Sequence, residues 1–572
     1  MTTVSRTSNT DHLAKDNADL NDFEQPRYSQ RDTLLTMIGV LMVMLLASLD
    51  QTIVSTALPR VVAELQGIDR YTWVATAYLL TSTVTVPIYG KLSDLIGRKP
   101  IFLFGVVVFL IGSAASGAAQ TMDQLIIFRA FQGLGAGALM PIAIAIIGDL
   151  FTPRERGKWQ GITGAVWGFS SIVGPTAGGW ITENTTWRWI FYVNLPIGII
   201  ALLVLIFLMP SLHNKTRQVS IDYIGATLLV VGTVPLLLGF TWAGNPYPWL
   251  SAQVIGPFAA AVVFLAAFII YEARLERRGG QPIIEPSLFK NRIFTVSTLI
   301  TTIFGMGLFG SIFFIPLFVQ GVIGTSVTNS GLILTPLMLT SMVASVTSGQ
   351  LVSRLGKYKW IAIVGMIITV VGSWMLVRLD VNATNADVLI AMMVLGLGMG
   401  FGMALYNLIV QNAMPRKIGQ ATSALVFFRS IGGTIALAAM GSLMTEAYLP
   451  AFHNALPALV KQAIPAKYLS FFDNPQVLLS PEAQTQMQAQ FASFGSQGQQ
   501  LYNSVITAVK VGLTQGIHNV FILSLAIMLI GLVAVFFLQE IPLKGGRIKE
   551  KTSVADAADQ AAPEPIAPVA FH

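Results

Sequence analysis

The sequence contains no cysteine and few charged residues. Without cysteine, the chain has no disulfide, no thiol nucleophile and no cysteine-ligated zinc or iron–sulfur centre. Charged residues make up only 11% of its 572 residues, whereas soluble domains carry about a quarter. Apolar residues reach 53%, and the mean hydropathy is +0.66. This composition excludes an ordinary soluble domain and predicts an integral membrane protein.

Sequence patterns typical of nucleotide binding and of hydrolysis are also missing. The chain has no phosphate-binding GxxxxGK[ST], no zinc-binding HExxH and no GxSxG nucleophile elbow. We therefore expect no catalytic residue, no metal site and no cofactor. Any transport against a gradient must then draw on an ion gradient.

Fourteen apolar segments of membrane-spanning length follow one another from Leu34 onward. A helix needs about 20 apolar residues to cross the hydrocarbon core. Backbone groups in that core must be satisfied within the segment, so runs of this length are predicted to be helices and the fold to be all-α. The segments are 34–57, 72–92, 100–119, 124–149, 157–181, 188–210, 221–243, 251–273, 292–321, 328–353, 359–379, 386–413, 417–447 and 516–540.

The placement of lysine and arginine predicts the orientation of the chain in the membrane. Basic residues are concentrated in cytoplasmic loops of membrane proteins. Most of the 35 lysine and arginine residues fall on one side if the N-terminus is cytoplasmic. We therefore predict a multi-pass plasma-membrane protein with both termini in the cytoplasm. The net charge of +7 then reflects topology, and we expect no nucleic-acid partner.

Two short stretches occur twice in the chain, which indicates an internal repeat. Gly349–Lys357 resembles Gly90–Arg98, and Pro415–Gly419 resembles Pro153–Gly157. Two repeats in the same order predict two homologous halves, a frequent plan in transporters. The predicted regions are a tail (1–33), a six-helix bundle (34–210), two extra helices (211–274), a cytoplasmic loop (275–291), five helices of a second bundle (292–447), an extracellular insertion (448–515), its sixth helix (516–541) and a cytoplasmic tail (542–572).

The loop Gly90–Pro100, read GKLSDLIGRKP, joins two of these helices on the predicted cytoplasmic side. Gly90 and Gly97 allow a close approach or a left-handed backbone, and Asp94 can accept hydrogen bonds from the amino end of a neighbouring helix. Arg98 and Lys99 keep the loop in the cytoplasm. A plain tight turn would explain one such loop. The repeat in the second half, with Gly349, Arg354 and Gly356, favours a pair of latches.

Polar residues inside predicted membrane helices are candidates for function. Asp50 lies deep in the first helix, where a carboxylate is costly to ionise and suits reversible proton binding. Arg129 and Gln132 share one face of the fourth helix, and a buried arginine needs a partner. Structural hydrogen bonds or a structural ion pair are the alternatives for Asp50 and Arg129.

The fifth predicted helix carries glycines at a spacing of four, which lets helices pack closely. Pro175 adds a local break. Close packing alone explains these glycines, and a hinge is the alternative. They are Gly164, Gly168, Gly174 and Gly178, with Gly179 beside the last.

Six stretches resemble, in order, the signature motifs of the major facilitator superfamily. With fourteen helices, they are similar to those of the 14-spanning drug:H⁺ antiporters. The resemblance implies two pseudo-symmetric six-helix bundles plus two extra helices. It assigns Asp50 to proton coupling or cation recognition, Arg129 to proton transfer, and Gly174, Pro175, Gly178 and Gly179 to an antiporter motif. The stretches are Leu49–Pro59, Gly90–Pro100, Arg129–Gly137, Gly174–Gly179, Trp187–Pro196 and Phe428–Gly433.

Several further residues have weaker signals. Arg429, deep in the thirteenth helix, is a candidate for an ion pair between the halves with Asp149 or Glu155. Asp222 is expected to cap a helix, and Ser480 with Pro481 predicts another helix start in the insertion. Flexible and aromatic side chains suit a promiscuous cavity, although ordinary packing explains most of them. The cavity candidates are Phe309, Phe313, Met403 and Tyr406.

The sequence as a whole predicts a proton-coupled antiporter that exports hydrophobic or cationic drug-like compounds by alternating access. The alternative is export of a lipid or lipid-like metabolite, guided outward by the insertion. A non-transporting receptor would not need a duplicated latch or buried charges. The expected partners are such small molecules and the lipid bilayer, with the protein a monomer.

Overall fold

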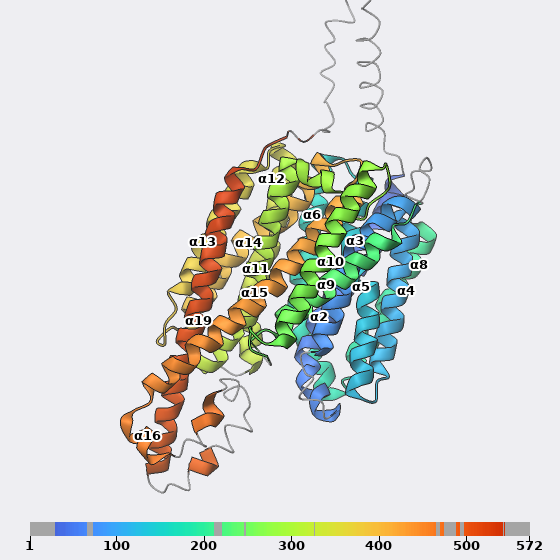
Figure 1. The fold of residues 1–572 in the computed structure, drawn as a ribbon. Coiled ribbons are helices and arrows are strands. Elements are labelled where there is room, and N and C mark those ends of the chain that lie inside the picture. The colour runs from blue at the N-terminus through green and yellow to red at the C-terminus, as the bar shows by residue number, and fades with distance from the viewer. Residues whose placement is uncertain are drawn as a thin grey trace, which may run out of the picture.

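A computed structural model describes residues 29–65, 73–210, 220–244, 247–324, 327–464, 469–473, 488–491, 497–541 and 543. Helices account for nearly all of these ranges (Figure 1). The predicted tails lie almost entirely outside the described residues, as does the predicted helix start at Ser480 and Pro481.

The first half of the chain forms one helical bundle. Its elements are α2 (Gln30–Leu65), α3 (Trp73–Ile96), α4 (Arg98–Gly117), α5 (Met122–Leu150), α6 (Pro153–Asn184), α7 (Trp189–Tyr192) and α8 (Asn194–Leu208). Two further helices follow, α9 (Tyr223–Trp242) and α10 (Ala252–Arg277), which pack on each other. A short 3-10 helix, η2 (Pro286–Lys290), leads into the second half.

The second half forms the other bundle. Its elements are α11 (Arg292–Phe318), the π-helical turn η3 (Val319–Ile323), α12 (Val327–Leu355), α13 (Lys359–Val377), α14 (Asn385–Ala413), α15 (Ile418–Ala455) and α19 (Gly498–Phe536). The insertion adds α16 (Ala458–Ala463) and the 3-10 turn η4 (Ser470–Asp473). The all-α fold with fourteen long helical segments is therefore confirmed across the described ranges.

Two predicted segments differ in detail from the helices observed. The segment 188–210 breaks at Val193 into α7 and α8, which places Asn194 at a helix start. The last helix begins at Gly498 rather than at 516, and α15 continues to Ala455, so both extend beyond the predicted spans. By length and composition alone, ten helices in the described ranges are apolar enough to cross a membrane. The helices α3, α6, α11 and α12 are not among these ten.

The two bundles meet along two seams. One joins α3 to α15 and the other joins α6 to α12. The helices α3, α6 and α12 each pack one face against a helix of the other half. Small residues allow this close packing, and these helices contain glycine, serine and threonine in place of some bulky apolar residues. The extra helix α9 contacts α3 and α15 at the edge of the first seam. The seams are the places where motion between the halves must occur.

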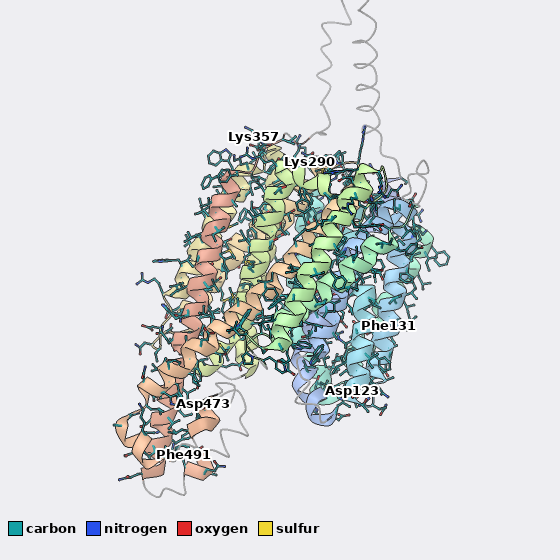
Figure 2. All side chains as sticks on the ribbon, in the orientation of Figure 1. Asp123, Phe131, Lys290, Lys357, Asp473 and Phe491 are labelled. Atoms are coloured by element: carbon teal, nitrogen blue, oxygen red, sulfur yellow. The ribbon has the colours of Figure 1, made fainter. Side chains whose placement is uncertain are left out.

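The two ends of the bundle differ in character. The start of α2 and the end of α19 lie at the same end, together with Lys290 and Lys357 (Figures 1 and 2). We call this the latch end, because Gly90–Pro100 and Gly349–Lys357 lie there. The opposite end carries Asp123, Asp473 and Phe491 (Figure 2). We call it the insertion end.

The insertion has a small apolar core of its own. Tyr448 stacks on Phe452 with ring centroids 5.8 Å apart, and the Tyr448 hydroxyl donates a hydrogen bond to the carbonyl oxygen of Phe472 at 2.5 Å. Phe491 contacts the rings of Phe472 and Tyr502. These contacts tie the ends of α15 and α19 into a projection beyond the bundle.

Candidate functional site

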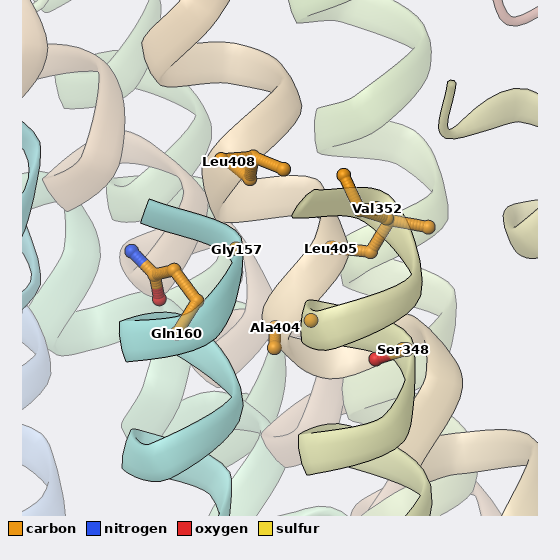
Figure 3. Close-up of a pocket in the computed structure, with 8 residues that line it drawn as sticks. Gly157, Gln160, Ser348, Val352, Ala404, Leu405 and Leu408 are labelled. Carbon is orange, nitrogen blue, oxygen red and sulfur yellow. The ribbon is translucent and has the colours of Figure 1, made fainter. Parts of the chain in front are cut away.

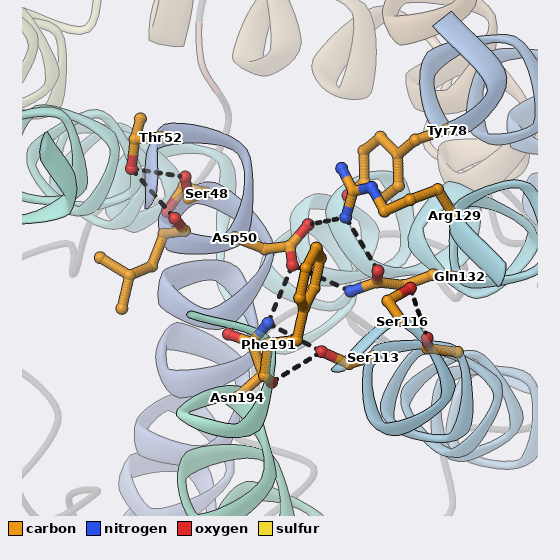
Figure 4. Close-up of polar contacts among 12 residues, drawn as sticks. Ser48, Asp50, Thr52, Tyr78, Ser113, Ser116, Arg129, Gln132, Phe191 and Asn194 are labelled. Carbon is orange, nitrogen blue, oxygen red and sulfur yellow. Dashed lines mark hydrogen bonds and ion pairs between the residues drawn. The ribbon is translucent and has the colours of Figure 1, made fainter. Parts of the chain in front are cut away.

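A buried ion pair lies in the centre of the first bundle. An Nη1 donor of Arg129 lies 2.8 Å from Oδ2 of Asp50. Asp50 has no exposed surface, and Arg129 is 2% exposed. Gln132 donates to Oδ1 of Asp50 at 2.9 Å. The structure thus brings together the three residues that the sequence analysis selected from α2 and α5 (Figure 4).

Asn194 and Ser113 complete the surroundings of the carboxylate, and the sequence analysis did not single them out. Asn194 donates to Oδ1 of Asp50 at 2.8 Å and approaches the Ser113 hydroxyl at 3.0 Å. Ser113 donates to the carbonyl oxygen of Phe191 at 2.9 Å. Asn194 is the first residue of α8, which follows α7 after the single residue Val193. Asn194 is part of the Trp187–Pro196 motif, which was the available signal.

Aromatic rings and close helix contacts hold Arg129 in place. Its guanidinium carbon lies 4.1 Å from the centroid of the Tyr78 ring, a cation–π geometry. A Cβ atom at Gly112 would lie 2.5 Å from Cα of Gln132. Only glycine therefore lets α4 approach α5 closely enough to place Ser113 beside the carboxylate.

Protonation of Asp50 would change the charge balance of this site. With Asp50 ionised, Arg129, Gln132 and Asn194 satisfy its two oxygens. Protonation would leave Arg129 buried without its counter-charge, and an uncompensated buried charge costs several kcal/mol. A proton on Asp50 therefore favours a rearrangement of the surrounding helices. Such coupling between protonation and conformation is what an ion-driven transporter requires.

Arg129→Lys separates a specific role for the guanidinium from a generic positive charge. One Nη atom of Arg129 contacts both Asp50 and Gln132 while the plane stacks on Tyr78, and a lysine ammonium cannot reproduce this. We expect transport to fall by about tenfold or more, equivalent to at least about 1.4 kcal/mol. The measurement is gradient-driven substrate flux in proteoliposomes.

Arg188→Lys is the matched control for that variant. Arg188 pairs with Glu64 at 2.8 Å, but both side chains are partly exposed, and exposed pairs contribute little. Its flux should match that of the unaltered protein. Full flux in the Arg129→Lys variant would instead assign Arg129 a generic structural charge.

The glycines of α6 serve two different contacts. A Cβ atom at Gly174 would lie 2.0 Å from Oγ1 of Thr52 on α2. Gly164 and Gly168 face Ser345 and Met342 of α12 in the same way. Pro175 lies within α6, Gly178 accepts a hydrogen bond from Thr182, and a Cβ atom at Gly179 would meet nothing within 4 Å. Close packing thus accounts for Gly174, whereas nothing in the packing requires glycine at 179.

The first latch, Gly90–Pro100, holds the amino end of α15. The backbone N–H groups of Gly419 and Gln420 donate to the two oxygens of Asp94 at 3.2 and 2.8 Å. This is the contact predicted for Asp94, and the helix dipole favours it. Arg98 bridges Asp94 and Asp149, with N–O distances of 2.5 and 2.6 Å.

Glycines make this contact possible. Gly97 has φ of 109°, a backbone conformation that favours glycine. A Cβ atom at Gly90 would lie 2.4 Å from Cβ of Ser423 on α15. Lys99 donates to the carbonyl oxygens of Ile206 and Met209 at the end of α8, so its role is within the first bundle.

The second latch, Gly349–Lys357, holds the amino end of α6. Ser353 occupies the position that corresponds to Asp94, and its hydroxyl donates to the carbonyl oxygen of Arg154. Arg154 in turn donates to the carbonyl oxygens of Ser353 and Arg354. A Cβ atom at Gly349 would lie 2.0 Å from the carbonyl oxygen of Gly157, and Gly356 has φ of 68°. The two latches therefore close the same end of both seams, and among the described residues only the first contains ion pairs.

The predicted ion pair of Arg429 with Asp149 or Glu155 is wrong. Asp149 pairs with Arg98, and Glu155 accepts hydrogen bonds from Thr152 in a capping box at the start of α6. Arg429 lies against Gly305 of α11 and forms no ion pair with any residue in the described ranges. The position of a basic residue along its helix does not predict which of several acidic residues it will contact.

The two predicted cavity residues whose side chains are described have different surroundings. Tyr406 is buried against Phe304, with ring centroids 5.8 Å apart, whereas Phe313 of α11 is 49% exposed. The side chains of Phe309 and Met403 lie outside the described residues. Tyr406 and Phe313 thus belong to different surroundings.

A small hollow lies between α6, α12 and α14, lined by Gln160, Ser348 and Leu408 among others (Figure 3). It has almost no space that even a water molecule could occupy, whereas ligand pockets begin at about 300 Å³. Gln160 is fully buried, and neither amide atom has a hydrogen-bond partner among the described residues. This hollow is a gap in the closed seam and too small for a drug-like molecule.

Comparisons with known proteins agree along most of the chain. The Major Facilitator Superfamily profile matches residues 40–437. The multidrug transporter protein MdtP of Bacillus subtilis (strain 168) is 38% identical over 551 residues, which cover 94% of this chain and 98% of that protein. Multidrug resistance protein 3 of the same organism is 36% identical over 517 residues, which cover 90% and 97%.

Solved structures share the fold at low sequence identity. The proton:xylose symporter XylE bound to 6-bromo-6-deoxy-D-glucose has a TM-score of 0.55 at 12% identity, over 90% of this chain and 97% of that chain. An inward-facing bacterial homologue of the human lysosomal transporter Spinster has a TM-score of 0.53 at 14% identity, over 90% and 100%. The fold and the relatives define a multi-pass membrane transporter rather than an enzyme. The chain belongs to the Major Facilitator Superfamily, as its motifs indicate.

Proposed function

We propose that this transporter exports hydrophobic or cationic drug-like compounds in exchange for protons. The observation that carries the proposal is the fully buried Asp50, paired with Arg129 at 2.8 Å and bound by Gln132 and Asn194. A carboxylate at this depth is a site for reversible protonation. The names of the relatives, a multidrug transporter and a multidrug resistance protein, support the substrate class.

The exchange proceeds by alternating closure of the two ends. In the state described here, both latches close one end of the seams. We place this end in the cytoplasm of a plasma-membrane protein, because Lys and Arg are concentrated in the loops on that side. Substrate then leaves from the opposite end, and protonation of Asp50 resets the bundles. No cofactor takes part, and the working unit is a monomer.

Flux through proteoliposomes tests the proposal. With an imposed pH gradient, concentrative movement of a lipophilic cation such as ethidium is expected, and an uncoupler should abolish it. A sodium gradient in place of the proton gradient should not support it. Concentrative flux that needs sodium, or that survives the uncoupler, would contradict proton exchange.

Deleting the insertion separates drug export from lipid export. Phe452 of α15 lies beside Gly512 of α19, so a short Gly-Ser linker can join Ala455 to Val509 on neighbouring antiparallel helices. A drug exporter is expected to keep at least about half its ethidium flux, because Asp50 and the latches are untouched. Loss of flux with normal insertion into the membrane would favour the lipid hypothesis, in which 448–515 guides cargo outward.

A further inference from the structure

The two extra helices carry a pair of carboxyl groups at the latch end, separate from Asp50. Asp222 caps α9, and its Oδ1 accepts a hydrogen bond from the backbone N–H of Gly225 at 2.8 Å. Glu272 lies near the end of α10 and is only 1% exposed. The internal repeat does not include these helices, and the proposed function so far uses neither residue.

The two carboxyl groups both lie against Gly225 in the first turn of α9. A Cβ atom at Gly225 would lie 2.2 Å from Oδ2 of Asp222 and 2.3 Å from Oε1 of Glu272, so these two oxygens are neighbours. None of these oxygens, nor Oε2 of Glu272, makes a hydrogen bond of normal geometry with the residues that the structure describes, although the backbone of Ile283 and Ile284 lies near Glu272 and Tyr271 lies near Asp222. Glu272 is buried and Asp222 is half-buried. Two adjacent carboxylates in such a place repel each other, whereas one shared proton would remove the repulsion and bond the pair.

The other charged and titratable groups nearby leave the pair without a counter-ion in the described ranges. On α10, Tyr271 lies next to Asp222, and Glu276 accepts from the backbone N–H of Ser287. Arg274 and Arg277 occupy the last turn of α10 and pair with neither carboxyl group.

The basic residues that face this region from α3 and α15 are already engaged. Lys91 of α3 and Lys417, just before α15, both bind Glu285. Since no described cation neutralises Asp222 or Glu272, a proton is the simplest ligand that can.

The segment 281–285 connects this pair to the first latch. Its residues Ile283 and Ile284 are buried, and their backbone amides face Glu272. The carbonyl oxygen of Ile283 accepts from the side chain of Gln420 at 2.6 Å, and Glu285 holds Lys91 and Lys417. A continuous series of contacts therefore runs from Glu272 to the amino end of α15, where Asp94 is bound.

We propose that Asp222 and Glu272 form a second proton-binding site, which holds one proton while the latch end is closed. Loss of that proton leaves two facing carboxylates, which separate, displace 281–285 and favour opening of the first latch. Raising the cytoplasmic pH would therefore shift the transporter towards the open latch end. The proposal rests on the alternating closure described above but not on Asp50.

Cysteine accessibility tests the proposal, because the chain has no other thiol. Ser423→Cys is a near-isosteric change at a position that is 1% exposed under the first latch. The rate of its labelling by a membrane-impermeant maleimide is measured at a series of pH values, in detergent, in an Asp50→Asn background. Labelling of Arg31→Cys, exposed at the start of α2 at the same end, corrects for the pH dependence of the thiol itself.

The corrected rate is expected to rise with pH, by at most about tenfold per unit, the limit for one proton. Glu272→Gln should abolish the rise and hold the rate at the value that the parent shows at low pH. Asp222→Asn should do the same, because asparagine preserves the helix cap. A rise that persists in both variants, or is missing from the parent, would overturn the proposal.

Infrared spectroscopy supplies an independent test. In the same Asp50→Asn background at neutral pH, the band of a protonated carboxylic acid should be present and should be lost in both Glu272→Gln and Asp222→Asn. An unchanged band in both variants would overturn the second site. Since Asp50 is absent from all these proteins, a negative result here leaves proton exchange at Asp50 standing, and failure of the flux assay does not affect this test.

Discussion

Replacing Asp50 with asparagine is expected to abolish proton-driven export while the protein still inserts into the membrane. Asparagine is nearly the same size and can still accept the hydrogen bonds that Gln132 and Asn194 donate to Oδ1. Asparagine cannot alternate between a charged and a neutral form, so no proton can be exchanged for the substrate at this position. Concentrative flux of ethidium under a pH gradient should fall to the level of empty liposomes.

Glu446→Gln is the matched control for Asp50→Asn. Glu446 also lies on a long membrane helix, α15, but it is exposed near the insertion end, where solvent stabilises the charge at little cost. Its flux is expected to equal that of the unaltered protein. Undiminished concentrative flux in Asp50→Asn would refute the coupling role, and a loss in Glu446→Gln would move that role elsewhere.

Gly90→Ala is expected to prevent the latch end from closing. The new Cβ atom would lie 2.0 Å from Oγ and 2.4 Å from Cβ of Ser423. The Ser423 Cβ atom cannot move away, because it is bonded to the backbone of α15. The helices α3 and α15 must therefore separate. Overpacking costs about 1–3 kcal/mol, which corresponds to about a fivefold to a hundredfold loss of the closed state. Flux should fall in proportion, and cytoplasmic accessibility of the seam should rise.

A second substitution, at Ser423, shows whether the effect of Gly90→Ala comes from overpacking. Ser423→Gly removes both clashing atoms, so the double variant Gly90→Ala/Ser423→Gly should recover most of the flux. Gly441→Ala, on the same α15, is the control, because a Cβ atom there would meet nothing within 4 Å. No recovery in the double variant would show that Gly90 matters for a reason other than its contact with Ser423.

Sequence patterns predicted those parts of the structure that depend on local chemistry. Long apolar runs predicted each membrane helix, because hydrocarbon permits few other conformations. The spacing of Arg129 and Gln132 on one helix face, together with the depth of Asp50, selected three residues that do contact one another. Asp94 at the first latch accepts from a helix amino end, as its position between two glycines suggested.

Contacts between distant segments were less predictable. Asn194 reaches Asp50 from 144 residues further along the chain, and no local pattern around either residue predicts that contact. Arg98 binds Asp149, which lies 51 residues further along the chain. Asp149 was one of the two acidic residues predicted to pair with Arg429. The pair Asp222 and Glu272 depends on the packing of α9 on α10, and the sequence marked Asp222 only as a cap.

Proton release on substrate binding is the most direct test of exchange at Asp50. Purified protein in weakly buffered detergent solution, at a pH where Asp50 is protonated, is mixed with ethidium while a pH indicator is followed. The unaltered protein is expected to release protons in proportion to the amount of bound substrate, and Asp50→Asn should bind ethidium without that release. Equal proton release from both proteins would contradict the assignment of the exchanged proton to Asp50.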